Sequence, residues 1–97
     1  MIVVYDKKGF TKLLEMPGYS LRGMDLRGVN LKEANLIQVD LTGADLRDAN
    51  LELADLRLVN LTDADLTGAR LEGADLMGAN LTNTKMDNKK VIPIQIA

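Results

Sequence analysis

Residues 64–81 read ADLTGARLEGADLMGANL and place a leucine at every fifth position, at 66, 71, 76 and 81. An α-helix turns by about 100° per residue, so leucines five apart would wind around it instead of forming a stripe. Side chains of a flat strand alternate with period two, so a step of five sends successive leucines to opposite faces. The stretch therefore predicts a geometry that is neither an α-helix nor a flat strand.

The five-residue period extends well beyond this stretch. The leucines in register are Leu21, Leu26, Leu31, Leu36, Leu41, Leu46, Leu51, Leu56, Leu61, Leu66, Leu71, Leu76 and Leu81. Two residues before each leucine stands Ala or Val, except at Tyr19 and Met24, and one residue before it stands Asp or Asn, except at Ser20 and Arg70. Met86 continues the register in degenerate form. This regularity is an internal repeat, and it predicts a repeat architecture.

The chemistry of each unit predicts a square coil. Residues two apart in an extended segment face the same way, so the small residue and the leucine point inward and the Asp or Asn points outward. The second position after most leucines is Gly, Asp or Asn. These residue types tolerate the positive φ that a type II turn requires. Four units of five residues, each with one such corner, therefore close a coil of twenty residues, and one leucine fills each side.

The units ANLIQ, ADLRD, ADLTG and ANLTN identify a resemblance to the pentapeptide-repeat family, whose pattern is A(D/N)LXX. The resemblance covers residues 19–83 and implies an all-β fold, a right-handed quadrilateral β-helix of about three coils. Members of this family differ widely in role, so the resemblance implies more about the fold than about the function.

The N-terminal flank, residues 1–18, is expected to cap the open end of the tube, which would otherwise leave backbone groups unpaired. Ile2–Tyr5 is a short β-type run. Phe10, Leu13 and Leu14 have helical spacing, and Thr11 is available as an N-cap, so we expect a short helix there. A second strand, forming a hairpin with the first, is the alternative.

The C-terminal flank, residues 84–97, is expected to hold the degenerate repeat and a capping strand. Val91–Ile96 reads as that strand, and Pro93 suits an edge position. Three placements stay open for it: pairing with Ile2–Tyr5, covering the last coil, or joining another subunit.

Composition excludes several classes of function. The chain has no Cys and no His, which removes disulfides, thiol chemistry, the commonest zinc ligands and the commonest general base. The net charge is −2, and residues 19–83 hold eleven acids and six bases, a balance of −5. We therefore expect no enzyme activity, cofactor or metal, and no direct binding to nucleic acid. No apolar run is long enough for a membrane span and no signal peptide is evident, so we expect a cytoplasmic protein that binds no membrane.

Stacking the coils predicts a candidate protein interface on the fourth side of the tube. The residues that follow the leucines there are Ile37, Arg57 and Met77, and the corners carry Leu53 and Leu58 where Gly, Asp or Asn is usual. Apolar side chains gathered around an arginine suit an interface. We expect contact with a protein partner, with a homodimer through this face or a chain terminus as the first case. Scattered tolerance of apolar residues, or cover by a folded-back N-terminal segment, are the alternatives.

The second side predicts a row of carboxylates, Asp25, Asp45 and Asp65. These could accept backbone hydrogen bonds at the corners, or they could imitate the phosphates of DNA. The family resemblance implies the second role, since some members bind type II topoisomerases such as DNA gyrase as DNA mimics. However, a tube of about 16 Å matches only about five base pairs, and Arg27 and Arg47 lie on the same side. The sequence thus favours a rigid, non-catalytic binding or structural module, with the DNA mimic as the alternative.

Overall fold

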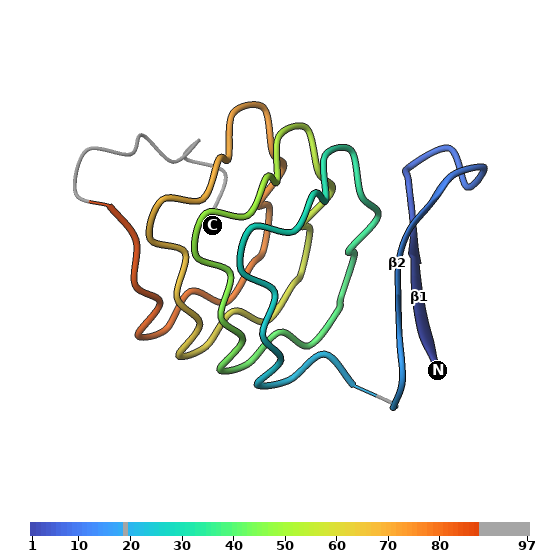
Figure 1. The fold of residues 1–97 in the computed structure, drawn as a ribbon. Coiled ribbons are helices and arrows are strands. Elements are labelled where there is room, and N and C mark those ends of the chain that lie inside the picture. The colour runs from blue at the N-terminus through green and yellow to red at the C-terminus, as the bar shows by residue number, and fades with distance from the viewer. Residues whose placement is uncertain (19, 88–97) are drawn as a thin grey trace.

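The computed structural model describes residues 1–18 and 20–87. From residue 20 onward the chain winds into stacked coils, and a short hairpin lies across one end of the stack (Figure 1). Residues twenty apart form parallel bridges, and four successive pairs occupy the four sides of a coil. These are Asp25 with Asp45, Asn30 with Asn50, Asn35 with Asp55, and Asp40 with Asn60. The period of twenty predicted from the repeat is therefore the period of the structure.

Backbone hydrogen bonds join each coil to both of its neighbours. The amide of Leu46 donates to the carbonyl of Asp65 on the next coil, at 2.8 Å, and the amide of Asp45 donates to Met24 on the preceding coil, at 2.9 Å. Within the coil, the amide of Ala49 closes a turn by donating to Leu46, at 3.0 Å. The same set of bonds recurs on each side, so the backbone is nearly identical from face to face.

The corners confirm the predicted turn chemistry and extend it. Positive φ occurs at the second position after every leucine of the register. Nine of these corners carry the expected types, Gly23, Gly28, Gly43, Asp48, Asp63, Gly68, Gly73, Gly78 and Asn83. The other four carry residues that do not favour this region, Glu33, Gln38, Leu53 and Leu58. Tertiary pairing therefore imposes the left-handed corner even where the local sequence opposes it.

The interior is a column of aliphatic side chains. Leu46 is fully buried, and the leucines of the five-residue register from Leu21 to Leu76 are each no more than 2% exposed. The alanines and Val59 fill the space between them. The prediction that Ala or Val and Leu point inward is confirmed, and Leu81, in the last described coil, is only partly buried.

The N-terminal flank differs from the expected strand and helix. Strand β1, Ile2–Tyr5, pairs antiparallel with strand β2, Lys12–Met16, so the predicted helix is wrong and the hairpin alternative is correct. The reason lies in the turn between them. The Asp6 carboxylate accepts the backbone amides of Phe10, at 2.9 Å, and Thr11, at 3.1 Å. Asp6 thus closes a loop that returns the chain as a strand, and Thr11 does not cap a helix.

The hairpin covers the first coil and is joined to it by backbone bonds. Asp6 forms an antiparallel bridge with Ala34, the amide of Lys7 donates to Glu33 at 2.8 Å, and the amide of Asn35 donates to Tyr5 at 2.9 Å. Val4 is buried, and further side chains of the hairpin pack on the core: Ile2, Leu13, Leu14 and Met16. The hairpin therefore covers this end of the tube.

At the other end, the degenerate repeat continues the coil. Lys85 forms a parallel bridge with Asp65, and its amide donates to Ala64 at 2.9 Å. The predicted strand Val91–Ile96 lies outside the described residues, and its pairing stays a prediction.

Candidate protein-binding face

The structure brings the predicted interface residues onto one face, which we call the fourth face and which runs from the corners at Glu33, Leu53 and Gly73 to those at Gln38, Leu58 and Gly78. The amide of Gln38 donates to Arg57, and the amide of Leu58 donates to Met77, each at 2.9 Å. Leu53, Leu58 and Met77 are 42%, 54% and 48% exposed. Ile37 is half-buried. The face thus presents three large, exposed apolar side chains on two adjoining coils.

The N-terminal segment does not cover these side chains. The end of β1 and the turn after it extend the edge of the fourth face beside residues 33–35, through the bonds of Tyr5 and Lys7 described above. Leu53, Leu58 and Met77 remain exposed with the hairpin in place. One alternative from the sequence, cover by a folded-back N-terminus, is therefore excluded for these three residues. Sequence reasoning missed that β1 joins this face, because nothing in the run IVVY specifies its partner.

Four corners of the fourth face are conformationally strained, at Glu33, Gln38, Leu53 and Leu58. Leu53 and Leu58 both have a φ of 59°. A non-glycine residue in this left-handed region costs roughly 1–2 kcal/mol, because Cβ lies close to the carbonyl oxygen. Six other corners avoid this cost with glycine. The strain is thus concentrated where the exposed apolar surface lies.

Each strained leucine lies across a glycine of the next coil. A Cβ placed on Gly73 would approach Leu53 Cδ2 to 2.6 Å, and one on Gly78 would approach Leu58 Cδ2 to 2.7 Å. A side chain at either glycine would collide with the leucine above it. The glycines therefore leave room for the two leucines to lie against the tube.

A bidentate ion pair between Asp55 and Arg57 lies between the two leucines. Arg57 Nε donates to Asp55 Oδ1 at 2.8 Å, and Arg57 Nη2 donates to Asp55 Oδ2 at 2.7 Å. The Asp55 side chain is 14% exposed and that of Arg57 is 50% exposed. The hydrogen bonds from the Arg57 guanidinium hold the pKa of Asp55 below its usual value, and the charge of Lys7 adds to the effect. Across this coil the outward side chains therefore follow one order: an apolar leucine at each corner, with the acidic Asp55 and the basic Arg57 between them.

The predicted acidic row lies on the second face, the side of the tube that Leu26, Leu46 and Leu66 fill from inside. Two of its three aspartates form ion pairs with arginine. Asp25, Asp45 and Asp65 lie side by side through parallel bridges. Arg27 holds Asp25 with two bonds, at 2.8 and 2.7 Å, and Arg47 holds Asp45 in the same way, at 2.9 and 2.6 Å. The hydrogen bonds from Arg27 lower the pKa of Asp25 to about 2.

The carboxylates of this row also bond the backbone. Asp25 and Asp45 each accept the amide of the arginine two residues later, at 3.2 Å. Asp65 accepts the amide of Thr67 at 3.0 Å and its hydroxyl at 2.6 Å. These bonds give each aspartate a structural role, and two of the three charges are matched by arginine. The arrangement offers little of the continuous negative charge that imitates a phosphate backbone.

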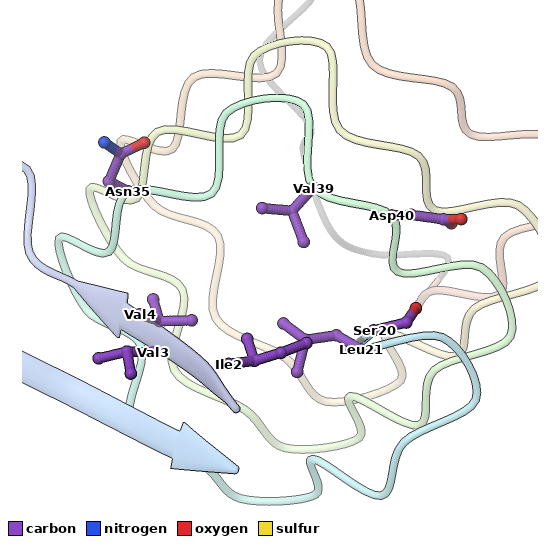
Figure 2. A pocket seen from close by; sticks show the side chains of 8 residues that line it. All are labelled: Ile2, Val3, Val4, Ser20, Leu21, Asn35, Val39 and Asp40. Carbon is purple, nitrogen blue, oxygen red and sulfur yellow. The ribbon is translucent and has the colours of Figure 1, made fainter. Parts of the chain in front are cut away.

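A cavity of about 240 Å³ lies between the hairpin and the first coil. Figure 2 shows Val4 and Val39 pointing into it, whereas the polar ends of Asn35 and Asp40 point away from its centre. Asp40 is engaged by the Thr42 amide at 3.0 Å and lies 3.6 Å from Arg22. The lining is mostly aliphatic, and the hydroxyl of Ser20 accepts the amide of Arg22 at 3.0 Å. We interpret the cavity as a packing defect between the N-terminal hairpin and the first coil.

The described residues hold no group of three or more carboxylates that could bind a metal ion. In the same part of the chain, no helix is long and apolar enough to cross a membrane.

Comparison with known proteins establishes the class. The profile of the family described as pentapeptide repeats matches residues 20–52 and 54–88, in eight copies. This chain belongs to the pentapeptide-repeat family, whose fold is the quadrilateral β-helix. No curated protein matches it.

Two solved structures from the cyanobacterium Nostoc are similar. The pentapeptide repeat protein alr5209 is 40% identical, with a TM-score of 0.66, over 70% of this chain and 56% of its own. HetL, a pentapeptide repeat protein involved in heterocyst differentiation regulation, is 32% identical, with a TM-score of 0.52, over 75% of this chain and 36% of its own. The matched region therefore spans about half or less of each of these proteins.

Proposed function

We propose that this chain is a rigid, non-catalytic module that binds protein through its fourth face, and that a second copy of the chain is its first partner. The observation that carries the proposal is the placement of Leu53 and Leu58. Both are exposed, and both occupy a backbone conformation that glycine or asparagine would adopt at lower cost. Local strain of this kind is typical of functional positions, where a gain elsewhere offsets it.

A non-catalytic role is supported by where the titratable groups lie. Asp25, Asp45, Asp55 and Asp65, whose pKa values are lowered, sit on the outer surface of the tube and bond a neighbouring arginine or threonine. General acids and bases are usually placed in a pocket that moves the pKa toward neutrality. The pKa values of these aspartates are instead lowered, away from neutrality. The right-handed coil of about three turns serves as a scaffold that fixes the positions of surface side chains.

The similarity to HetL supports a regulatory setting for such binding, because that protein is involved in regulating differentiation. The match covers 75% of this chain, most of which is the stack of coils, so we infer that any shared role rests on the surface of those coils. The fourth face is the part of the described surface that departs most from the repeat pattern.

The double substitution Leu53→Asn with Leu58→Asn tests this proposal. Asn tolerates left-handed φ, so the free energy of unfolding should change by less than about 1 kcal/mol. We expect sedimentation equilibrium to show a concentration-dependent dimer for the native chain and a monomer for the variant. The matched control is Asp48→Asn with Asp63→Asn, which changes two corners off the face and should leave association intact. A native chain that stays monomeric up to millimolar concentration would contradict self-association.

The alternative function, a DNA mimic that binds DNA gyrase, has weaker support. The predicted length of about 16 Å and the arginines on the second face both oppose it. A supercoiling titration with gyrase should show no inhibition at large molar excess. Dose-dependent inhibition that disappears in Asp45→Asn with Asp65→Asn would establish the mimic instead.

A further inference from the structure

The order of side chains across the fourth face determines which residues would face each other in a dimer formed through this face. Across the central coil the outward residues are Leu53, Asp55, Arg57 and Leu58, from one corner to the other. The acid and the base lie at the same level of the tube, because the inward Leu56 stands between them in sequence. A leucine at each corner flanks the pair.

Two-fold symmetry allows two ways to place this face on its copy, since a closed dimer uses the same patch on both subunits. If the axis runs along the tube, the tubes are parallel and the order across the face is reversed. Asp55 then faces Arg57 of the second copy, and Leu53 faces Leu58 of the second copy. If the axis runs across the tube, the tubes are antiparallel and each of these residues faces itself. That arrangement sets carboxylate against carboxylate and guanidinium against guanidinium.

Charge complementarity therefore selects one arrangement. Resting on the function proposed above, we propose that two copies associate side by side with parallel tubes, with Arg57 of each copy donating to Asp55 of the other and Leu53 packing on Leu58 of the other. The guanidinium has donors available for this. Its bonds to Asp55 use Nε and Nη2, and an arginine carries five N–H donors in all.

The central coil carries this complementarity, and the coils beside it contribute less. Ile37 and Met77 face Asn35 and Asp75 of the second copy in the parallel arrangement. The face is a few strands tall, so the buried area falls in the range of weak, transient contacts. The dimer should accordingly form at micromolar concentrations and above, and should dissociate on dilution.

The second face shows why the leucines are needed. Asp45 and Arg47 have the same order and the same paired bonds as Asp55 and Arg57. Their flanking corners are Gly43 and Asp48, which offer no apolar contact. An exposed ion pair alone contributes little to association. The fourth face combines matched charge with apolar corners, and the second face has the charge alone.

Disulfide cross-linking tests the orientation directly, since the chain contains no cysteine. Leu53→Cys and Leu58→Cys are made as separate proteins, and cross-linking is measured in a glutathione buffer for each alone and for their mixture. The parallel dimer predicts a heterodimeric cross-link in the mixture, at least about tenfold above that of either protein alone. Asp63→Cys, at a corner off the face, is the control and should not cross-link with either.

The outcomes separate the orientation from the function. Homodimeric cross-links in each protein alone, without a heterodimeric cross-link in the mixture, would show antiparallel tubes and overturn the inference. Absence of any cross-link above the Asp63→Cys control, while the native chain is a dimer that Leu53→Asn with Leu58→Asn dissociates, would overturn it too and leave the proposed function standing. A native chain that is monomeric at all concentrations would overturn both.

Discussion

The second and fourth faces share one backbone and differ in what stands at the corners. Both carry an Asp–Arg pair with two side-chain bonds, at Asp45 and Arg47 on one face and at Asp55 and Arg57 on the other. The corners beside the first pair are Gly43 and Asp48, which suit positive φ, and those beside the second are Leu53 and Leu58, which do not. The fold therefore fixes the corner conformation, and the residue at each corner decides which side chain the surface exposes.

The interior should not distinguish the two faces. Leu46 and Leu56 fill the tube behind the second and fourth faces, and both are fully buried. We expect Leu46→Ala and Leu56→Ala each to lower the free energy of unfolding by about 3–5 kcal/mol, because each leaves a cavity in a closely packed core. Chemical denaturation measures both, with Thr62→Ala on the outer surface as a control that should cost little. A large effect at one leucine and none at the other would show that the faces differ inside as well as outside.

Placing leucines at the corners of the second face should give it the binding properties of the fourth face. Gly43→Leu with Asp48→Leu places a leucine at each corner beside Asp45 and Arg47. A Cβ on Gly43 has room, because its nearest neighbour outside the adjoining residues is Gly23 Cα, 4.0 Å away. We expect a loss of roughly 1–2 kcal/mol at each corner from strain in the left-handed region.

The transplanted variant should also gain association. If apolar corners and matched charge are enough, sedimentation will show a larger species than the native dimer, formed through the second face as well. The proper control keeps the strain and omits the apolar side chain: Gly43→Gln with Asp48→Gln should lose stability to a similar degree and gain no association. Association in that control would show that corner leucines are not the determinant.

Exchanging the charges of Asp55 and Arg57 tests whether this pair acts between two copies of the chain. Arg57→Asp sets two carboxylates on each copy and should weaken the dimer by about tenfold or more. Asp55→Arg with Arg57→Asp reverses the order of the pair, and a parallel dimer again matches acid with base, so association should return to within about threefold of native. The matched exchange on the second face, Asp45→Arg with Arg47→Asp, should change association little. If the fourth-face exchange fails to restore what Arg57→Asp removes, the pair does not act between copies.

Much of this architecture could be predicted from the sequence, because each five-residue unit fixes its own local geometry. The inward Leu46, the outward Asp45 and the turn residue Gly43 follow from strand alternation and turn preference. Periodicity then placed Ile37, Arg57 and Met77 on a common face. Such a prediction depends on repetition, so it extends only as far as the repeat is regular.

The rest depended on contacts that no local pattern specifies. The hairpin replaced the expected helix because the carboxylate of Asp6 binds the amides of Phe10 and Thr11, a contact that spacing alone does not reveal. The attachment of β1 to residues 33–35 is a tertiary pairing of the same kind. At Leu53 and Leu58, residue preference and structure disagree, since the stack of coils imposes positive φ on them. Such disagreement between local and global requirements is typical of functional positions, and here it falls on the proposed interface.

The smallest expected effect concerns the aspartates that both faces use. Hydrogen bonds from Arg27 lower the pKa of Asp25 from its ordinary 3.8 to about 2 in the folded chain. The unfolded chain therefore binds a proton at this group more readily than the folded chain does. The resulting stabilisation is present above about pH 4 and is lost as the pH falls toward 2.

Arg27→Gln removes the guanidinium and isolates this effect. We expect the titration midpoint of the Asp25 carboxyl, followed by carbon NMR, to rise from about 2 toward 3.8, while stability at neutral pH changes little because the pair is exposed. The Asp55 carboxyl on the fourth face should keep its lowered pKa in this variant, because its own hydrogen bonds come from Arg57. A midpoint for Asp25 that does not move would mean that the backbone amide of residue 27, and not its side chain, sets the charge on the second face. The two faces would then differ in their ion pairs as well as in their corners.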